Sequence, residues 1–137
     1  MDLPGFFRLL DELAEAWATP DAERAAACFT ADAVYMEPPD RQLFVGVDQL
    51  TAYFGALTPG TYLRFHHRSF DETSGMGAIE FSFGVEGEDT ADHGTAVIEI
   101  RDGRIATWRE YVRRGPTDFD EFVATAKDWQ WHIGNYP

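Results

Sequence analysis

The spacing of apolar residues differs between the two parts of the chain, and in the first part it is helical. Between residues 4 and 18 the apolar positions recur every three or four residues, which predicts an amphipathic helix. Residues 19–21, Thr-Pro-Asp, are typical of a helix start, so a short second helix is expected at about 20–28. A third helix is expected to begin near Val47 and to stop at Gly60. The positions assigned to buried helical faces are Phe6, Leu10, Leu13, Ala14, Trp17, Leu50, Tyr53, Phe54 and Leu57.

The second period is two residues long and indicates strands. Residues 61–71, 76–87, 91–101 and 104–113 each alternate between apolar and polar side chains, with turn residues between them. The Asp102-Gly103 pair between the last two predicts a hairpin, so the four strands should form an antiparallel meander. Thr117 is expected to cap a final helix. That helix would bury Phe119, Phe122, Val123 and Ala126, and an aromatic tail follows it with Trp129, Trp131, His132 and Tyr136.

One further strand is expected before the third helix. Val34 and Met36 alternate there with Tyr35 and Glu37, and two prolines end the run. Residues 40–46 are expected to form a loop. The layout is therefore α+β: N-terminal helices pack on a curved antiparallel sheet, which leaves a cone-shaped cavity between them. We expect one domain over residues 1–137, with the C-terminal helix and tail from about residue 116.

Composition narrows the functional classes. The chain has 137 residues, of which 45% are hydrophobic and 15% aromatic, so it is not a disordered chain. The aromatic load suits an aromatic-lined pocket or a homodimer interface on the convex face of the sheet, and both remain open. A net charge of −13 opposes binding to nucleic acid and to anionic membranes. With one cysteine, no signal-like N-terminus and no membrane-length apolar run, the protein is expected in the cytoplasm.

The candidate chemistry lies on two strands. Side chains two residues apart on a strand share a face. Tyr35 therefore points to the same side as Glu37, and Trp108 to the same side as Glu110. If both pairs face the cavity, carboxylates sit among aromatic rings, and their desolvation favours acid–base chemistry. For either carboxylate the structural alternative remains open: Glu37 as a rim group in water, and Glu110 as part of a salt bridge.

The remaining titratable residues are weaker candidates. His66 and His67 are adjacent on a strand and therefore point to opposite faces. Phe65 belongs to the apolar face, so His67, two residues later, is expected to point inward and His66 outward. Glu80 is expected on the convex face, while Asp92 and His93 could reach the cavity mouth. The spacing of histidines and acids supports no metal site.

Three sequence motifs resemble those of the nuclear transport factor 2-like superfamily. They are Phe-Thr-Ala-Asp-Ala-Val-Tyr at 29–35, Gly-x-x-x-Leu-x-x-Tyr-Phe at 46–54, and Asp-Gly-Arg-Ile-x-x-Trp-Arg-Glu-Tyr at 102–111. Over about residues 4–115 the chain is most similar to the SnoaL-like polyketide cyclases and the limonene-epoxide-hydrolase-like branch. The resemblance implies the cone fold. It leaves the activity open, because this superfamily includes isomerases, hydrolases, cyclases, dehydratases and binding modules.

The resemblance also carries over particular residues. Glu110 takes the place of an Asp that belongs to the catalytic set of limonene epoxide hydrolases, whereas their middle-strand Arg-x-Asp pair has no complete counterpart here. Tyr35 matches their water-holding Tyr, and Glu37 replaces the Asn. Glu37 also matches the general-base position of ketosteroid isomerases, but their two oxyanion donors fall near Leu13 and Ala96. For ring-forming members the set implied here is Tyr35, His67 and Glu110.

The resulting hypothesis is a cofactor-independent enzyme for a small, largely apolar organic molecule. Glu110 and Glu37 would transfer protons, and Tyr35 and His67 would orient the substrate. The apolar wall would comprise Trp108, Phe65, Tyr53 and Phe54. The reaction would be a cyclisation, isomerisation, dehydration or epoxide opening. The alternative is a non-catalytic module of the same fold that binds a hydrophobic ligand or acts as a dimeric interaction domain.

Overall fold

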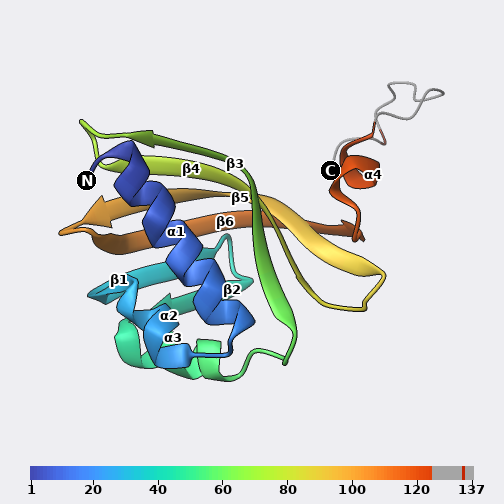
Figure 1. Cartoon of the computed structure of the whole chain (residues 1–137), viewed down its shortest axis with the longest axis horizontal. Helices are drawn as coiled ribbons and strands as arrows, with labels where there is room; N and C mark the ends of the chain where they lie inside the picture. Colours follow the sequence, from blue (N-terminus) through green and yellow to red (C-terminus); the bar gives the residue numbers. More distant parts are fainter. Residues whose placement is uncertain (125–133, 135–137) are drawn as a thin grey trace.

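Helices α1, α2 and α3 cover one face of a curved, six-stranded mixed sheet, as the α+β prediction requires (Figure 1). The computed structural model describes residues 1–124 and 134. The helices are α1 (Leu3–Ala18), α2 (Ala22–Ala27), α3 (Val47–Gly55) and the short α4 (Phe119–Val123). The strands are β1 (Phe29–Glu37), β2 (Gln42–Val45), β3 (Thr61–Asp71), β4 (Met76–Val85), β5 (Thr90–Arg101) and β6 (Arg104–Pro116).

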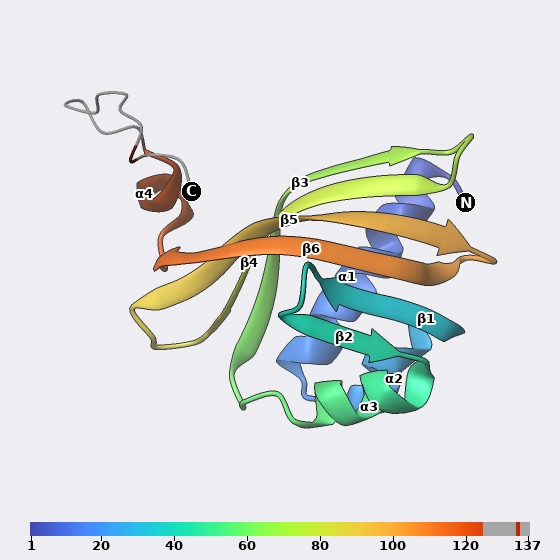
Figure 2. The same ribbon diagram turned by 180° about the vertical axis from the view of Figure 1, so that it is seen from behind.

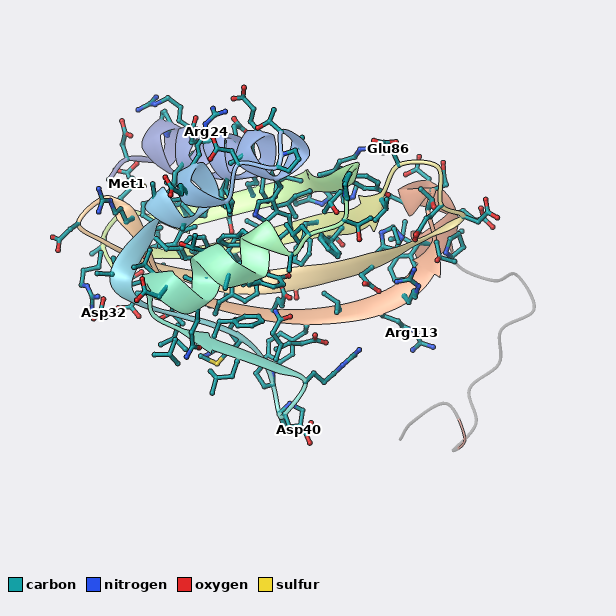
Figure 3. The ribbon with its side chains drawn as sticks, turned by 90° about the horizontal axis from the view of Figure 1, so that it is seen from below. Met1, Arg24, Asp32, Asp40, Glu86 and Arg113 are labelled. Carbon is teal, nitrogen blue, oxygen red and sulfur yellow. The ribbon has the colours of Figure 1, made fainter. Side chains whose placement is uncertain are left out.

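The sheet order is β2-β1-β6-β5-β4-β3, and the rear view in Figure 2 displays it. The predicted antiparallel meander of β3 to β6 is confirmed. The sheet is mixed rather than antiparallel throughout, because β1, which the sequence did not place in the meander, pairs with β6 in parallel. The expected loop over 40–46 also contains β2, which forms an antiparallel hairpin with β1. Asp40 marks the turn of that hairpin in Figure 3.

The first helix buries the face that its periodicity predicts. Phe6, Leu10, Leu13 and Trp17 are at most 3% exposed, and the Asp2 side chain caps the helix by accepting from the backbone N–H of Gly5 at 2.8 Å. Figure 1 shows α1 running across the sheet. Two helix starts differ from the sequence expectation by one or two residues: Asp21 caps α2, whereas the expected start began at Thr19, and Asp118 rather than Thr117 caps α4.

Helix α4 lies apart from the helical layer, beyond the end of β6 (Figure 2). Within α4, Phe119 stacks on His66 with ring centroids 3.6 Å apart, and Phe122 stacks on His93 at 4.2 Å. Gly115 permits this contact, since a Cβ atom there would lie 2.4 Å from the Phe122 ring. Ala126 and the aromatic tail with Trp129, Trp131, His132 and Tyr136 lie outside the described residues.

Candidate active site

A cavity of about 90 Å³ opens between the helical layer and the concave face of the sheet. Its position agrees with the predicted cone. The volume is well below the roughly 300–1,000 Å³ of common small-molecule pockets, so it suits a small ligand. The residues that line it are Trp17, Tyr35, Glu37, Gln42, Tyr53, Phe81, Phe83, Asp92, Glu110 and Val112.

Glu110 lies at the polar end of the cavity and is only 7% exposed. Its Oε2 accepts hydrogen bonds from the Tyr35 hydroxyl at 2.9 Å and from the Trp108 indole Nε1 at 2.7 Å. Its Oε1 accepts from the Gln42 amide Nε2 at 3.3 Å. These donors are all uncharged. The salt bridge that was the structural alternative for Glu110 is therefore absent from the described residues.

Strand register brings these groups together. Tyr35 on β1 is the direct neighbour of Trp108 on β6, and their rings stack with centroids 5.5 Å apart and planes 7° apart. Glu110 follows two residues later on β6 and therefore shares the face of Trp108. Gln42 is opposite Glu37 in the β1–β2 hairpin. The parallel β1–β6 pairing thus joins two sequence motifs that lie about seventy residues apart.

Burial sets the proton affinity of Glu110. The pKa of this carboxyl is raised from 4.5 to about 7, chiefly by desolvation and in smaller part by the negative charges of Glu37 and Asp92. The hydrogen bonds from Trp108 and Tyr35 act in the opposite direction, because they stabilise the ionised form. A carboxyl with a pKa near 7 can both donate and accept a proton at neutral pH.

The other two carboxylates of the cavity have cationic partners at its rim. Glu37 is 9% exposed, and its Oε1 lies 3.1 Å from Arg41 Nη1. Asp92 lies 3.5 Å from Arg114, which also contacts Glu88. The side chains of both arginines are mostly exposed, at 64% and 58%. The predicted inward direction of Glu37 is therefore confirmed, together with an ion pair that the sequence did not indicate.

The predicted inward direction of His67 was wrong. A β-bulge in β3 between Phe65 and His67 shifts the pairing, so that His67 is opposite Glu80 rather than Ile79. The His67 side chain is 79% exposed, and its Nδ1 lies 2.5 Å from the Glu80 carboxylate. Glu80 itself does not line the cavity, which fits its predicted place on the other face. His67 therefore cannot orient a substrate in this cavity.

His93 also lies away from the cavity, in a hydrogen-bonded chain beneath α4. Its Nε2 donates to the Pro116 carbonyl at 2.6 Å, and its Nδ1 shares a hydrogen bond of 2.7 Å with the Ser82 hydroxyl. The Ser82 hydroxyl shares a second hydrogen bond of 2.7 Å with His66 Nε2. Ser82 and His93 are 3% and 2% exposed. The expectation that His93 could reach the cavity mouth was wrong.

The apolar wall differs in part from its prediction. Tyr53 lines the cavity, but Phe54, Phe65 and Trp108 do not; Phe54 and Trp108 are buried in the core, and Phe65 packs against it. Phe81 and Phe83 line the cavity instead. They share a strand face with Ile79 on β4, and this alternation could have predicted that they point inward. Trp17 and Gln42 were missed as lining residues. Trp17 ends the apolar stripe of α1, whereas Gln42 stands in a segment without a strand pattern.

The described residues give two further findings. None of their His, Cys, Asp and Glu side chains gather in a group of three or more that could hold a metal ion. No helix among them is long and apolar enough to cross a membrane.

The model of the SnoaL-like domain family matches residues 10–108. The chain belongs to this family. The matched region contains Tyr35, Glu37 and Trp108 and ends just before Glu110, so the match does not cover the complete site. No curated protein matches the sequence of this SnoaL-like domain.

Solved structures support the same fold for this SnoaL-like domain. A cystatin-like protein of unknown function from Methylobium petroleophilum PM1 is 17% identical, with a TM-score of 0.73 over 96% of this chain and 98% of the other. An epoxide hydrolase of the limonene-epoxide-hydrolase-like type from M. tuberculosis is 19% identical, with a TM-score of 0.65 over 77% and 80%. A protein of ketosteroid isomerase-like fold from Catenulispora acidiphila DSM 44928, in complex with trimethylamine, is 17% identical, with a TM-score of 0.64 over 75% and 83%. At these identities the likeness concerns the fold alone.

Proposed function

We propose that this SnoaL-like domain is an enzyme that transfers a proton to or from a small organic substrate, with Glu110 as the general acid–base group. The observation that carries the proposal is a buried carboxyl at a cavity wall, with a pKa of about 7 and, among the residues that the structure describes, hydrogen bonds from uncharged donors alone. General acid–base catalysis is most effective when the pKa of the group lies near the working pH. Proton transfer by a carboxyl group requires neither a metal nor an organic cofactor.

The surrounding residues support a division of roles. Tyr35, Trp108 and Gln42 fix the Glu110 carboxyl in one orientation and leave it facing the cavity. Glu37 is a second carboxylate that lines the cavity, where it would take up or return a second proton of the substrate. The reaction class remains cyclisation, isomerisation, dehydration or epoxide opening. That the neighbouring structures include an epoxide hydrolase and a complex with trimethylamine supports a small organic substrate.

The dimeric interaction module of the same fold is favoured by one observation. Leu43, Val45 and Tyr111 are 64%, 50% and 51% exposed on β2 and β6, and none of them lines the cavity. A homodimer formed through these side chains would leave the cavity unchanged, because it would use the other face of the sheet. Dimerisation is thus compatible with the enzyme proposal, and it becomes the leading function only if the cavity supports no turnover.

The proposal is tested by the pH dependence of turnover. A panel of small epoxides, enolisable ketones and hydroxylated amines is incubated with the protein, and product formation is followed by NMR from pH 5 to pH 9. We expect the turnover of a converted substrate to change with a single ionisation near pH 7, since the pKa of Glu110 is about 7. A turnover that stays flat through pH 7, or the conversion of no substrate class, would speak against Glu110 as the acid–base group.

A further inference from the structure

The charges that line the cavity are all of one sign. Glu37, Asp92 and Glu110 contribute carboxyl groups to the wall, and none of the described lining residues is basic. Arg41 and Arg114 approach Glu37 and Asp92 from the solvent side and do not line the cavity. The interior therefore offers negative potential to a ligand and no cationic partner for an anion.

Aromatic rings form most of the remaining wall. Trp17, Tyr35, Tyr53, Phe81 and Phe83 line the cavity, and Trp17 meets Phe83 edge-on with centroids 5.4 Å apart. The faces of such rings carry negative electrostatic potential and attract ammonium groups, most strongly when the cation is desolvated. A wall of this kind favours alkylated ammonium groups over hydrated metal ions, in keeping with the lack of a metal-binding cluster among the described residues.

Trp17 adds an observation that is independent of charge. Its side chain is 3% exposed and lines the cavity, yet its indole Nε1 has no hydrogen-bond partner among the described residues. A buried N–H group without a partner costs roughly 1–3 kcal/mol. An oxygen atom on a bound ligand would accept from this N–H and remove that cost. The cavity therefore favours a ligand that has a hydrogen-bond acceptor as well as a positive charge.

We propose that the cavity binds a small organic cation, an alkylated ammonium group that carries an oxygen acceptor on a short chain. The ammonium group lies among the aromatic rings, near Asp92 and Glu37, and its oxygen accepts from Trp17. A cavity of about 90 Å³ equals the liquid volume of about three water molecules, so it restricts the ligand to a compact cation on a short chain. This inference rests on the proposed use of the cavity as the substrate site.

A cation in the cavity also changes the titration of Glu110. Positive charge stabilises the ionised carboxylate, so binding lowers the pKa of Glu110 from its value of about 7. By linkage, the affinity for the cation rises as the pH increases from 6 to 8, because an increasing fraction of the free protein then already carries the ionised form.

Choline and its uncharged carbon isostere, 3,3-dimethylbutanol, test the proposal, because they share their shape and hydroxyl group and differ in charge. Each is titrated into the whole chain while the backbone and indole N–H signals are followed by NMR. We expect choline to bind about tenfold or more tightly than the alcohol, with shifts at Trp17 and Tyr53. Trp17→Phe keeps an aromatic ring and removes the N–H. It should therefore weaken the binding of choline, which has an oxygen acceptor, more than the binding of tetramethylammonium, which has none.

Substitutions of the two acidic partners of Arg114 provide a matched comparison. This arginine contacts Asp92, which lines the cavity, and Glu88, which does not. Asp92→Asn should weaken choline binding several-fold, whereas Glu88→Gln should leave it within twofold of the parent protein. Equal effects of the two variants would place the cation outside the cavity and overturn the proposal.

The remaining outcomes separate this inference from the proposed function. If the alcohol binds as tightly as choline, the cavity is a site for neutral ligands. The proposal of a cationic ligand is then wrong, whereas proton transfer by Glu110 is unaffected. If neither ligand shifts the Trp17 or Tyr53 signals at millimolar concentration, the proposal of a cationic ligand is also wrong. The pH dependence of turnover then tests the proposed function separately.

Discussion

Replacing Glu110 with glutamine is expected to lower turnover by about 10²- to 10⁴-fold, the range that general acid–base groups contribute. The glutamine amide has nearly the shape of the carboxyl group. Its oxygen can accept from both Tyr35 and Trp108, and its NH₂ can donate to a flipped Gln42 amide, so the wall of the cavity is kept. The variant loses only the exchangeable proton. The kcat on a substrate identified from the panel, with the fold checked by NMR, measures the effect.

Glu99→Gln is the matched control for this substitution. Glu99 lies on β5, next to the strand that carries Glu110, and its side chain is exposed. The same change in charge and shape is therefore made outside the cavity, and turnover should stay within about twofold. If Glu110→Gln and Glu99→Gln both retained full activity, proton transfer by Glu110 would be excluded.

The second large effect concerns the pH dependence of stability. The pKa of Glu110 is raised from 4.5 in the unfolded chain to about 7 in the fold, so the folded protein binds the proton more tightly. The stability that this proton provides is fully present below pH 4.5 and is lost as the pH rises toward 7. The loss amounts to about 3 kcal/mol, since each unit of difference in pKa corresponds to about 1.4 kcal/mol.

Urea unfolding of the parent protein and of Glu110→Gln at pH 5 and pH 8.5 isolates this contribution. All other groups are shared, so the difference between the two proteins reports Glu110 alone, apart from small denatured-state effects. We expect the glutamine variant to gain most of the 3 kcal/mol relative to the parent as the pH rises, and therefore to be the more stable protein at pH 8.5. An unchanged difference between pH 5 and pH 8.5 would mean that Glu110 titrates alike in the folded and unfolded chain.

The residues at the centre of the site could be predicted because strand parity is a local property. The alternation around Tyr35 and Glu37, and around Trp108 and Glu110, fixed which side chains share a face before any pairing was known. That these two faces meet depends on the parallel pairing of β1 with β6. This pairing joins distant segments, and no local pattern in either strand specifies its partner or its direction.

His67 illustrates where parity fails. A single extra residue in β3 shifts all later side chains of that strand to the other face, and the alternation on each side of the bulge looks regular. No glycine or proline in residues 61–71 marks the position. Gln42 was missed for a different reason: β2 has four residues and lies at the sheet edge, which is too short for a periodic signal.

The most direct test of the account is the titration of Glu110 itself. The side-chain carboxyl carbon can be followed by NMR from pH 4 to pH 9 in protein labelled at glutamate, and its signal is assigned by its absence in Glu110→Gln. We expect a midpoint near pH 7, because the carboxyl is buried beside Glu37 and Asp92 and its donors within the described part of the chain are uncharged. A midpoint near 4.5 would show that the group is solvated like a surface glutamate and would contradict the proposed acid–base role.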